Sequence, residues 1–327
     1  MARAYLDQIR ATLDSVTIAE IERLIEYRDN SALGDVLTLG VFAGLMELIR
    51  SGYIAGGKAE VNSVPRSMGR QELDVNAAGA QSWLAEHIAA LKAQMAMDQV
   101  DGIRVTVSSG LQAGRSPRQI ALDLAGRVSK QTGRRTGGSV GLPGNFAQYV
   151  ADARTQLRSG DAEQLRKYLT RTRRDKRFDP AVLRALKEGR PVAQADADRI
   201  AGRYADRLLQ THAQMIARTE ALESFSAGRD RVYEQLVERG LPREAIVKDW
   251  ETRRDEKVRN SHAGMQGQTR ALGEPFRTNA GALLRYPGDR GLGAGWDETA
   301  NCRCQARYTI RANYARRDAG NLRGAIR

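Results

Sequence analysis

The sequence predicts a mainly α-helical protein that ends in a small α+β module. Apolar residues recur at helical spacing along most of the chain before Gly240, which is typical of long amphipathic helices. After residue 244, β-branched residues occur in short runs between segments dense in glycine and proline, which is typical of short strands and turns. The chain has 327 residues, more than one hydrophobic core usually serves, so we expect several domains.

Residues 1–50 predict an N-terminal helical segment. Thr17 precedes an apolar series at helical spacing, and Glu20 completes a capping-box pattern. The run "VLTLGVFAGLMELI" predicts a second helix, which we expect to end before Gly52. Its uncharged part, residues 36–46, is too short to span a bilayer, so we predict a buried helix and no membrane anchor.

Residues 51–76 predict a linker, because "SGYIAGGKAEVNSVPRSMG" is rich in glycine, serine and proline. Residues 77–240 predict a helical body. Its first long helix is expected to end at Gly114, after which "SPRQIALDL" opens the next helix with a serine cap, a proline in the first position and a glutamine that completes a capping box. A glycine-rich loop at 132–145 precedes shorter helices and a long helix over about 196–238.

Residues 241–310 predict the α+β module, and residues 311–327 predict a basic tail. The run "EAIVKDWETR" predicts a strand at 244–253, and "CRCQARYTI" predicts the strand that closes the module. Between them we expect a short helix capped by Asp255, followed by turns and short strands.

Positive charge is concentrated in the middle of the chain. Residues 1–100 carry 9 basic and 13 acidic side chains, whereas residues 101–210 carry 22 and 11. The densest cluster consists of Arg171, Arg173, Arg174, Lys176 and Arg177. Such a segment attracts phosphate backbones through counterion release, although a solvated helix face explains it equally well. From it we predict weak, sequence-independent binding of duplex DNA.

Both cysteines of the chain, Cys302 and Cys304, lie in the stretch "ETANCRCQARY". Alternate side chains of a regular strand share a face, so the two thiols can converge on one ligand, whereas a disulfide between them would be strained. Together with His262, one of three histidines, they offer ligand types that suit a structural Zn²⁺ ion. A zinc site and a packed cluster of thiols both stay open at this point.

Asp255 is the candidate fourth ligand. In a continuous helix it would share a face with His262 but lie about 10.5 Å away along the axis, so we favour a helix cap for its carboxylate. The enzymatic alternative is a catalytic constellation of a cysteine with His262 and Asp255. The sequence places no thiol at a helix N-terminus and predicts no oxyanion hole, which argues against that alternative.

Five segments occur in one order: "IARTEALESFSAGRDRVYE", "WETRRDEKVRNSHAGMQGQ", "EPF", "YPGD" and "NCRC". Each is weak alone, but the shared order and compatible spacing are specific. This order resembles the Mu F-like phage head-morphogenesis family, the minor capsid or minor head proteins. The resemblance covers roughly residues 210–310, and "GLQAGRSPRQIALDL" adds roughly residues 108–130, whereas residues 140–195 look like an insertion.

The resemblance implies a low-copy structural component of the virion, located at the capsid and portal vertex and present in the host cytoplasm during assembly. Its expected partners are the portal protein, other head proteins and genomic DNA bound without sequence preference. We expect no enzymatic activity, although the four letters "ARTE" leave a transferase activity open beside the plainer interpretation as one turn of amphipathic helix. The zinc ion is the one cofactor that the residues themselves suggest. The alternative is a thiol- or metal-dependent hydrolase carried in the virion.

Overall fold

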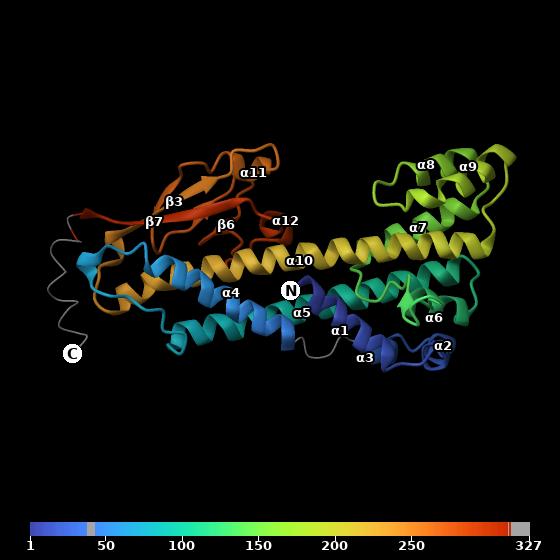
Figure 1. The fold of residues 1–327 in the computed structure, drawn as a ribbon, viewed down its shortest axis with the longest axis horizontal. Helices are drawn as coiled ribbons and strands as arrows, with labels where there is room; N and C mark the ends of the chain where they lie inside the picture. Colours follow the sequence, from blue (N-terminus) through green and yellow to red (C-terminus); the bar gives the residue numbers. More distant parts are fainter. Residues whose placement is uncertain (38–42, 313, 315–327) are drawn as a thin grey trace. The chain divides into compact units, whose positions relative to one another are not determined.

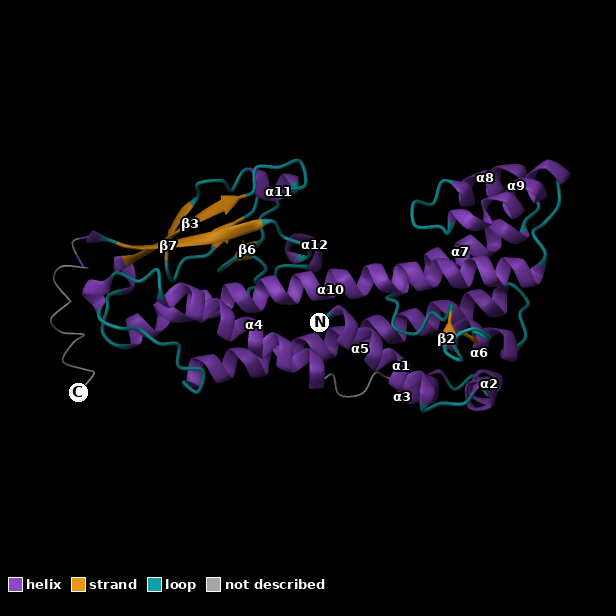
Figure 2. Ribbon diagram, viewed as in Figure 1, coloured by secondary structure: helices purple, strands orange, loops and turns teal. Residues whose placement is uncertain are grey.

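The computed structural model describes residues 1–37, 43–312 and 314 of the chain. Helices predominate, and most strands lie in the C-terminal module, as predicted (Figure 1, Figure 2). The chain divides into two compact units: the first contains Met1, Ala43–Ala89 and the chain from Met215 onward, and the second contains the remaining segments. This division differs from the sequential order of domains predicted above, because the long helices α5 (Ala78–Gln112) and α10 (Gln194–Glu238) each contribute residues to both units.

The second unit consists of short helices and a hairpin, in addition to parts of α5 and α10. Its other helical elements are α1 (Ala2–Asp14), α2 (Ile18–Glu26), α3 (Asn30–Leu37), α6 (Pro117–Ala125), α7 (Gly144–Arg158), α8 (Ala162–Leu169), the 3₁₀ turn η2 (Lys176–Phe178) and α9 (Asp179–Glu188). Strands β1 (Arg127–Val128) and β2 (Arg135–Thr136) pair antiparallel. Part of this hairpin falls within the loop predicted at 132–145.

Two of the helix starts that were predicted from capping residues are confirmed, those at Thr17 and Ser116. The Thr17 hydroxyl accepts the Glu20 N–H at 3.2 Å at the start of α2. At the start of α6 the Ser116 hydroxyl accepts the Gln119 N–H at 3.3 Å, and the Ser116 N–H donates to the Gln119 side chain at 3.0 Å. These bonds satisfy N–H groups that have no partner inside the helix.

Helices α7, α8, α9 and α10 form one hydrophobic core of the second unit. Leu157, Leu165, Tyr168, Val182 and Ile200 are all fully buried in it. Each of these residues lies on the apolar face of its own helix, so the amphipathic pattern in the sequence corresponds to a packed interior here.

The first unit combines helices with the α+β module. Besides parts of α5 and α10 it contains α4 (Ala43–Val61), η1 (Arg66–Met68), η3 (Arg243–Ala245), β3 (Ile246–Thr252), α11 (Asn260–Ala263), β4 (Thr269–Ala271), β5 (Phe276–Arg277), β6 (Leu283–Leu284), α12 (Trp296–Thr299) and β7 (Cys304–Ile310). The strands predicted at 244–253 and in "CRCQARYTI" are therefore present, as β3 and β7.

Antiparallel strands in the order β4-β3-β7 form the main sheet of the module. Strands β3 and β7 pair along their whole length, with Trp250 opposite Ala306 and Thr252 opposite Cys304. Alternate residues of β7 are buried, beginning with Cys304. That face of β7 joins a hydrophobic core that also contains Trp250 and residues from the end of α10.

The helix expected to end before Gly52 instead continues to Val61, which corrects the first part of the predicted linker. Residues 38–42 of the same predicted helix lie outside the described residues. The glycines of α4 do not break it because they permit close packing. Gly56 lies against the main-chain carbonyl group of Phe225 in α10, and a side chain at this position would collide with that main chain.

Candidate functional site

The two cysteines and His262 converge within the module. The Sγ atoms of Cys302 and Cys304 lie 3.5 Å and 3.6 Å from His262 Nδ1. The three donor atoms all lie within 4.8 Å of one another, and both cysteines are free thiols. The structure thus brings together the three residues that the sequence singled out as candidate metal ligands.

Strand β7 and the short helix α11 position these side chains. Cys304 begins β7, whereas Cys302 precedes the strand instead of lying on it as expected. The Arg253 N–H donates to the Arg303 main-chain oxygen at 3.1 Å, so the chain still pairs with its neighbour between the two cysteines. Helix α11 supplies His262 from the other side of the cluster.

The core of the module encloses most of this cluster. His262 is 1% exposed and Cys304 is 7% exposed, whereas Cys302 is half-buried. The imidazole ring meets the indole ring of Trp250 edge-on, with the ring centroids 5.4 Å apart. Trp250 is itself fully buried, as expected of a core anchor.

The two thiols have different acidities because each acts on the other. The hydrogen bond from the Cys302 thiol lowers the pKa of Cys304 to about 5, and His262 and Trp250 also favour the Cys304 thiolate, while burial opposes it. The same hydrogen bond, together with burial, raises the pKa of Cys302 well above its ordinary value. The cluster therefore favours one thiolate and one thiol.

Glu298 lies behind the imidazole ring and was not predicted. Its Oε2 atom is 3.2 Å from His262 Nε2, on the opposite side of the ring from the thiols. This is a close contact and not a hydrogen bond, since the buried Nε2 atom has no hydrogen-bond partner of good geometry among the described residues. The Ser261 hydroxyl donates to the same Glu298 oxygen at 2.8 Å and holds it in place.

Asp255 does not join the cluster, and it does not cap the helix that supplies His262. Its Oδ2 atom accepts a hydrogen bond from Arg303 at 2.6 Å, which lowers the pKa of the carboxyl group. Its Oδ1 atom accepts the Lys257 N–H at 3.1 Å, so it stabilises a turn. Helix α11 begins later, at Asn260, which corrects the start predicted for this helix.

Carboxylates neutralise part of the basic segment at 171–177. Arg174 donates two hydrogen bonds to Asp179, both at 2.9 Å. Arg177 likewise donates to both oxygens of Asp175. These two arginines therefore contribute less free positive charge than the sequence suggests.

Of the other three cations of the segment, two are available to a ligand. The Arg171 guanidinium lies over the Tyr204 ring, 5.4 Å from its centroid, and donates to Gln156 at 3.0 Å. Arg173 and Lys176 are exposed, and neither forms an ion pair with any residue in the described part of the chain. The surface available to a phosphate backbone is thus centred on these two side chains.

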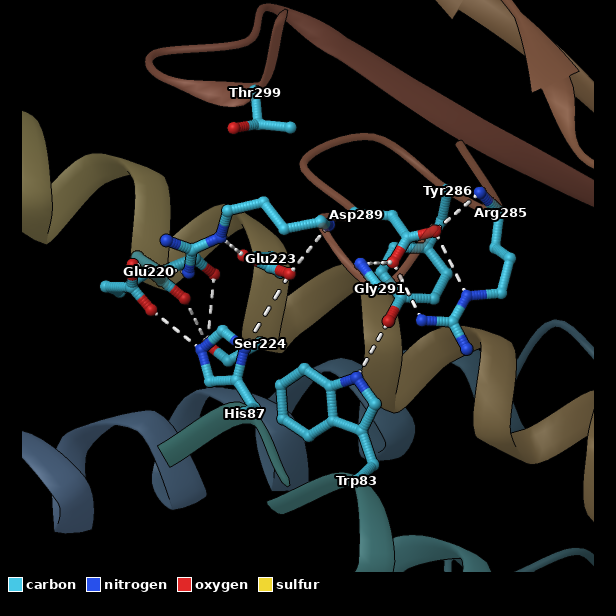
Figure 3. Close-up of polar contacts among 12 residues, drawn as sticks. Trp83, His87, Glu220, Glu223, Ser224, Arg285, Tyr286, Asp289, Gly291 and Thr299 are labelled. Carbon is cyan, nitrogen blue, oxygen red and sulfur yellow. Dashed lines mark hydrogen bonds and ion pairs between the residues drawn. The ribbon is translucent and has the colours of Figure 1, made fainter. Parts of the chain in front are cut away.

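A second polar cluster joins α5, α10 and the loop after β6 (Figure 3). His87 Nε2 lies 2.7 Å from Glu220 Oε2, and His87 Nδ1 lies 3.6 Å from Glu223 Oε1. Arg290 donates to both carboxylates at 2.7 Å. Burial raises the pKa of Glu223, while Arg290 and His87 oppose that rise. Because Arg290 already binds both carboxylates, we interpret this cluster as an ion network rather than a metal site.

Further contacts fasten the same loop to the helices. Trp83 Nε1 donates to the Tyr286 hydroxyl group at 2.8 Å. Asp289, which is fully buried, accepts the Arg285 N–H at 2.8 Å and also binds the Arg285 guanidinium group. The "YPGD" segment is therefore a folded loop whose polar groups are satisfied within the first unit.

Glu220 and Glu223 were not predicted as site residues. A signal was present, because both share the face of α10 that buries Ile216 and Ala227, and a carboxylate on an apolar face needs a partner. The partners come from two segments far away in sequence, so periodicity alone does not identify them.

Residues 176–307 match the model of a family described as Phage Mu protein F like protein. The matched range covers fewer than half of the residues of the chain and contains both cysteines, His262 and the carboxylates of the ion network. It begins inside the stretch 140–195 that was expected to be an insertion, and it does not include residues 108–130. No curated protein and no solved structure matches the chain.

Proposed function

The chain carries a region of the Phage Mu protein F like family, and from this premise we propose that it is a minor head protein of a phage. It acts with the portal protein and other head proteins during head assembly in the host cytoplasm, and it stays in the virion at the portal vertex. The family match over residues 176–307 is the observation that carries this proposal.

The structure supports an assembly role through the way the matched region is built. Its segments form a compact module on the end of α10, held by buried polar contacts. Within the described residues, no helix is both long and apolar enough to cross a membrane.

Purified heads test this proposal directly. We expect mass spectrometry of heads from the encoding phage to detect the chain at low copy number. Co-expression of the tagged chain with the portal protein should yield a complex that survives gel filtration. Mature heads that lack the chain, together with no complex in the co-expression experiment, would contradict the proposal.

Contact with DNA is a second, narrower proposal. It is supported by the exposed Arg173 and Lys176 side chains, which lack carboxylate partners in the described part of the chain. Such side chains bind phosphate groups without reading sequence. Arg174 and Arg177 are paired with carboxylates, so they hold the segment in place and add little free positive charge.

We also propose that the role is structural rather than enzymatic. A nucleophilic thiol must be reached by its substrate, whereas Cys304 and His262 are buried in the core of the module. If the purified chain hydrolysed peptidoglycan, peptide or nucleic acid substrates, and a Cys304→Ser variant did not, this proposal would be overturned in favour of a virion hydrolase.

A further inference from the structure

We infer that His262, Cys302 and Cys304 bind one zinc ion, which ties the first and last parts of the module together. This inference does not depend on the role of the chain in the virion.

The separation of the donor atoms is that of a tetrahedral zinc site. Zinc binds thiolate sulfur at about 2.3 Å and imidazole nitrogen at about 2.0 to 2.1 Å, so sulfur and nitrogen ligands of one tetrahedral ion lie roughly 3.5 Å apart. The distances from His262 Nδ1 to the two Sγ atoms are 3.5 Å and 3.6 Å. The three side chains therefore need little rearrangement to bind a metal ion.

Hydrogen bonding alone explains this arrangement less well. An unprotonated Nδ1 atom offers a single lone pair and accepts one good hydrogen bond. Two sulfur atoms nevertheless lie at nearly the same distance from it. A metal ion takes one bond from each donor, so one ion accounts for both distances, whereas hydrogen bonds from Cys302 to Cys304 and between Cys304 and His262 account for only one of them.

Glu298 orients the imidazole ring for this purpose. A carboxylate near Nε2 favours the tautomer that carries hydrogen on Nε2, and this leaves the lone pair of Nδ1 facing the thiols. The Ser261 hydroxyl group holds Glu298 in that position. A metal-bound histidine commonly has such a carboxylate behind it.

The fourth position of the site falls to water. Within the described residues, no further histidine, cysteine or carboxylate joins the group of three. Asp255, the fourth ligand considered from sequence, is engaged by Arg303. Cys302 is half-buried, so solvent reaches the edge of the cluster.

The ion would connect segments that are far apart in sequence. His262 and Cys302 are 40 residues apart in sequence. The chain between them contains only the short strands β4, β5 and β6, the single turn α12 and many glycines. A metal bond between the two ends of this segment should add to the core contacts that Phe276 and Leu284 make within it and stabilise the module further.

Metal analysis of the full chain is the first test. Protein purified under reducing conditions without chelator should contain about one zinc per chain, and cobalt should replace zinc with the absorption of a thiolate-bound tetrahedral ion. Removal of the metal by a chelator should lower the melting temperature, and added zinc should restore it. Metal-free protein whose melting temperature does not respond to either treatment would overturn the inference.

Variants locate the site. The double variant Cys302→Ser, Cys304→Ser should lose the zinc, whereas the matched control Asp255→Asn should keep it. Glu298→Gln should retain a site with zinc affinity reduced by roughly 10- to 100-fold, as is typical of residues that orient a metal ligand. Zinc retained at full stoichiometry in the double variant would exclude this site.

A measurement on the unmodified chain covers the case in which the double variant does not fold. With zinc bound, the two thiols should react slowly with a thiol reagent, and a chelator should increase the rate. Equal rates with and without chelator would show that packing alone protects the thiols and would overturn the inference.

Discussion

The Cα atom of Gly228 in α10 lies directly against the main-chain carbonyl oxygen of Tyr53 in α4. Gly56 of α4 lies in the same way against the carbonyl group of Phe225 in α10. Each helix thus offers a glycine to the main chain of the other. This exchange explains how α4 continues through a stretch whose glycine content suggested a linker.

Gly228→Ala should destabilise the first unit, because the new methyl group would force main chain apart. We expect a loss of about 1 to 3 kcal/mol in the free energy of unfolding, measured by urea denaturation. Gly34→Ala in α3 is the matched control, since among the described residues the nearest atom to its Cβ would be a Val100 methyl carbon at 3.8 Å. The control should be neutral or more stable by up to about 1 kcal/mol. Equal destabilisation by the two changes would contradict this account.

Arg290→Met should be strongly destabilising, because it leaves Glu220 and Glu223 buried without their guanidinium partner. Breaking a buried ion network by removal of one partner typically costs about 3 to 5 kcal/mol. Arg243→Met is the control, since the ion pair of Arg243 with Glu234 is largely exposed and should contribute about 1 kcal/mol or less. Chemical denaturation of the two variants compares these costs, and similar losses would argue against a cooperative network.

His212 should make the stability of the second unit depend on pH. Burial against the rings of Tyr5 and Phe146 lowers its pKa from 6.5 to about 4. The unfolded chain therefore binds a proton near pH 6.5 and the folded chain only near pH 4, so stability falls as the pH is lowered between these values, by about 3 kcal/mol in total. Above pH 6.5 this residue contributes no pH dependence.

His212→Phe should remove this part of the pH dependence while keeping an aromatic ring in place. The difference in unfolding free energy between the variant and the unmodified chain should shift in favour of the variant as the pH falls from 7 to 4.5. Other carboxyl groups titrate in this range in both proteins, so the difference isolates His212. A difference that is constant with pH would show that the pKa of His212 is the same in the folded and unfolded states and would contradict the prediction.

Arg173→Glu combined with Lys176→Glu should weaken binding to duplex DNA and reduce its dependence on salt. The slope of log affinity against log salt concentration is negative, and each lost phosphate contact should reduce its magnitude by about 0.9. Arg66→Glu combined with Arg70→Glu changes the net charge equally on exposed residues of the other unit and is the matched control. Fluorescence anisotropy at several salt concentrations measures both, and equal effects would indicate a general charge effect without a DNA-binding surface.

The sequence by itself determined most of the local structure. The caps at Thr17 and Ser116, the strand that contains Trp250 and the long helix that ends before Gly240 all follow from interactions among residues close in sequence. Capping bonds, apolar periodicity and turn residues act over a few residues, so both interacting groups lie in the same short stretch of sequence. The proximity of the Cys302 and Cys304 thiols likewise follows from their spacing in the sequence.

Only the tertiary structure decided which distant groups meet. The convergence of His262 on the thiols, the place of Glu298 behind it and the pairing of Asp255 with Arg303 depend on how β7 and α11 pack. The same is true of the glycines in α4, which the sequence presents as helix breakers. Glycine lowers helix stability locally, but the close approach to α10 that it permits buries enough surface to outweigh that local cost. Burial and contact between remote segments, which no local pattern encodes, set the outcome at each of these positions.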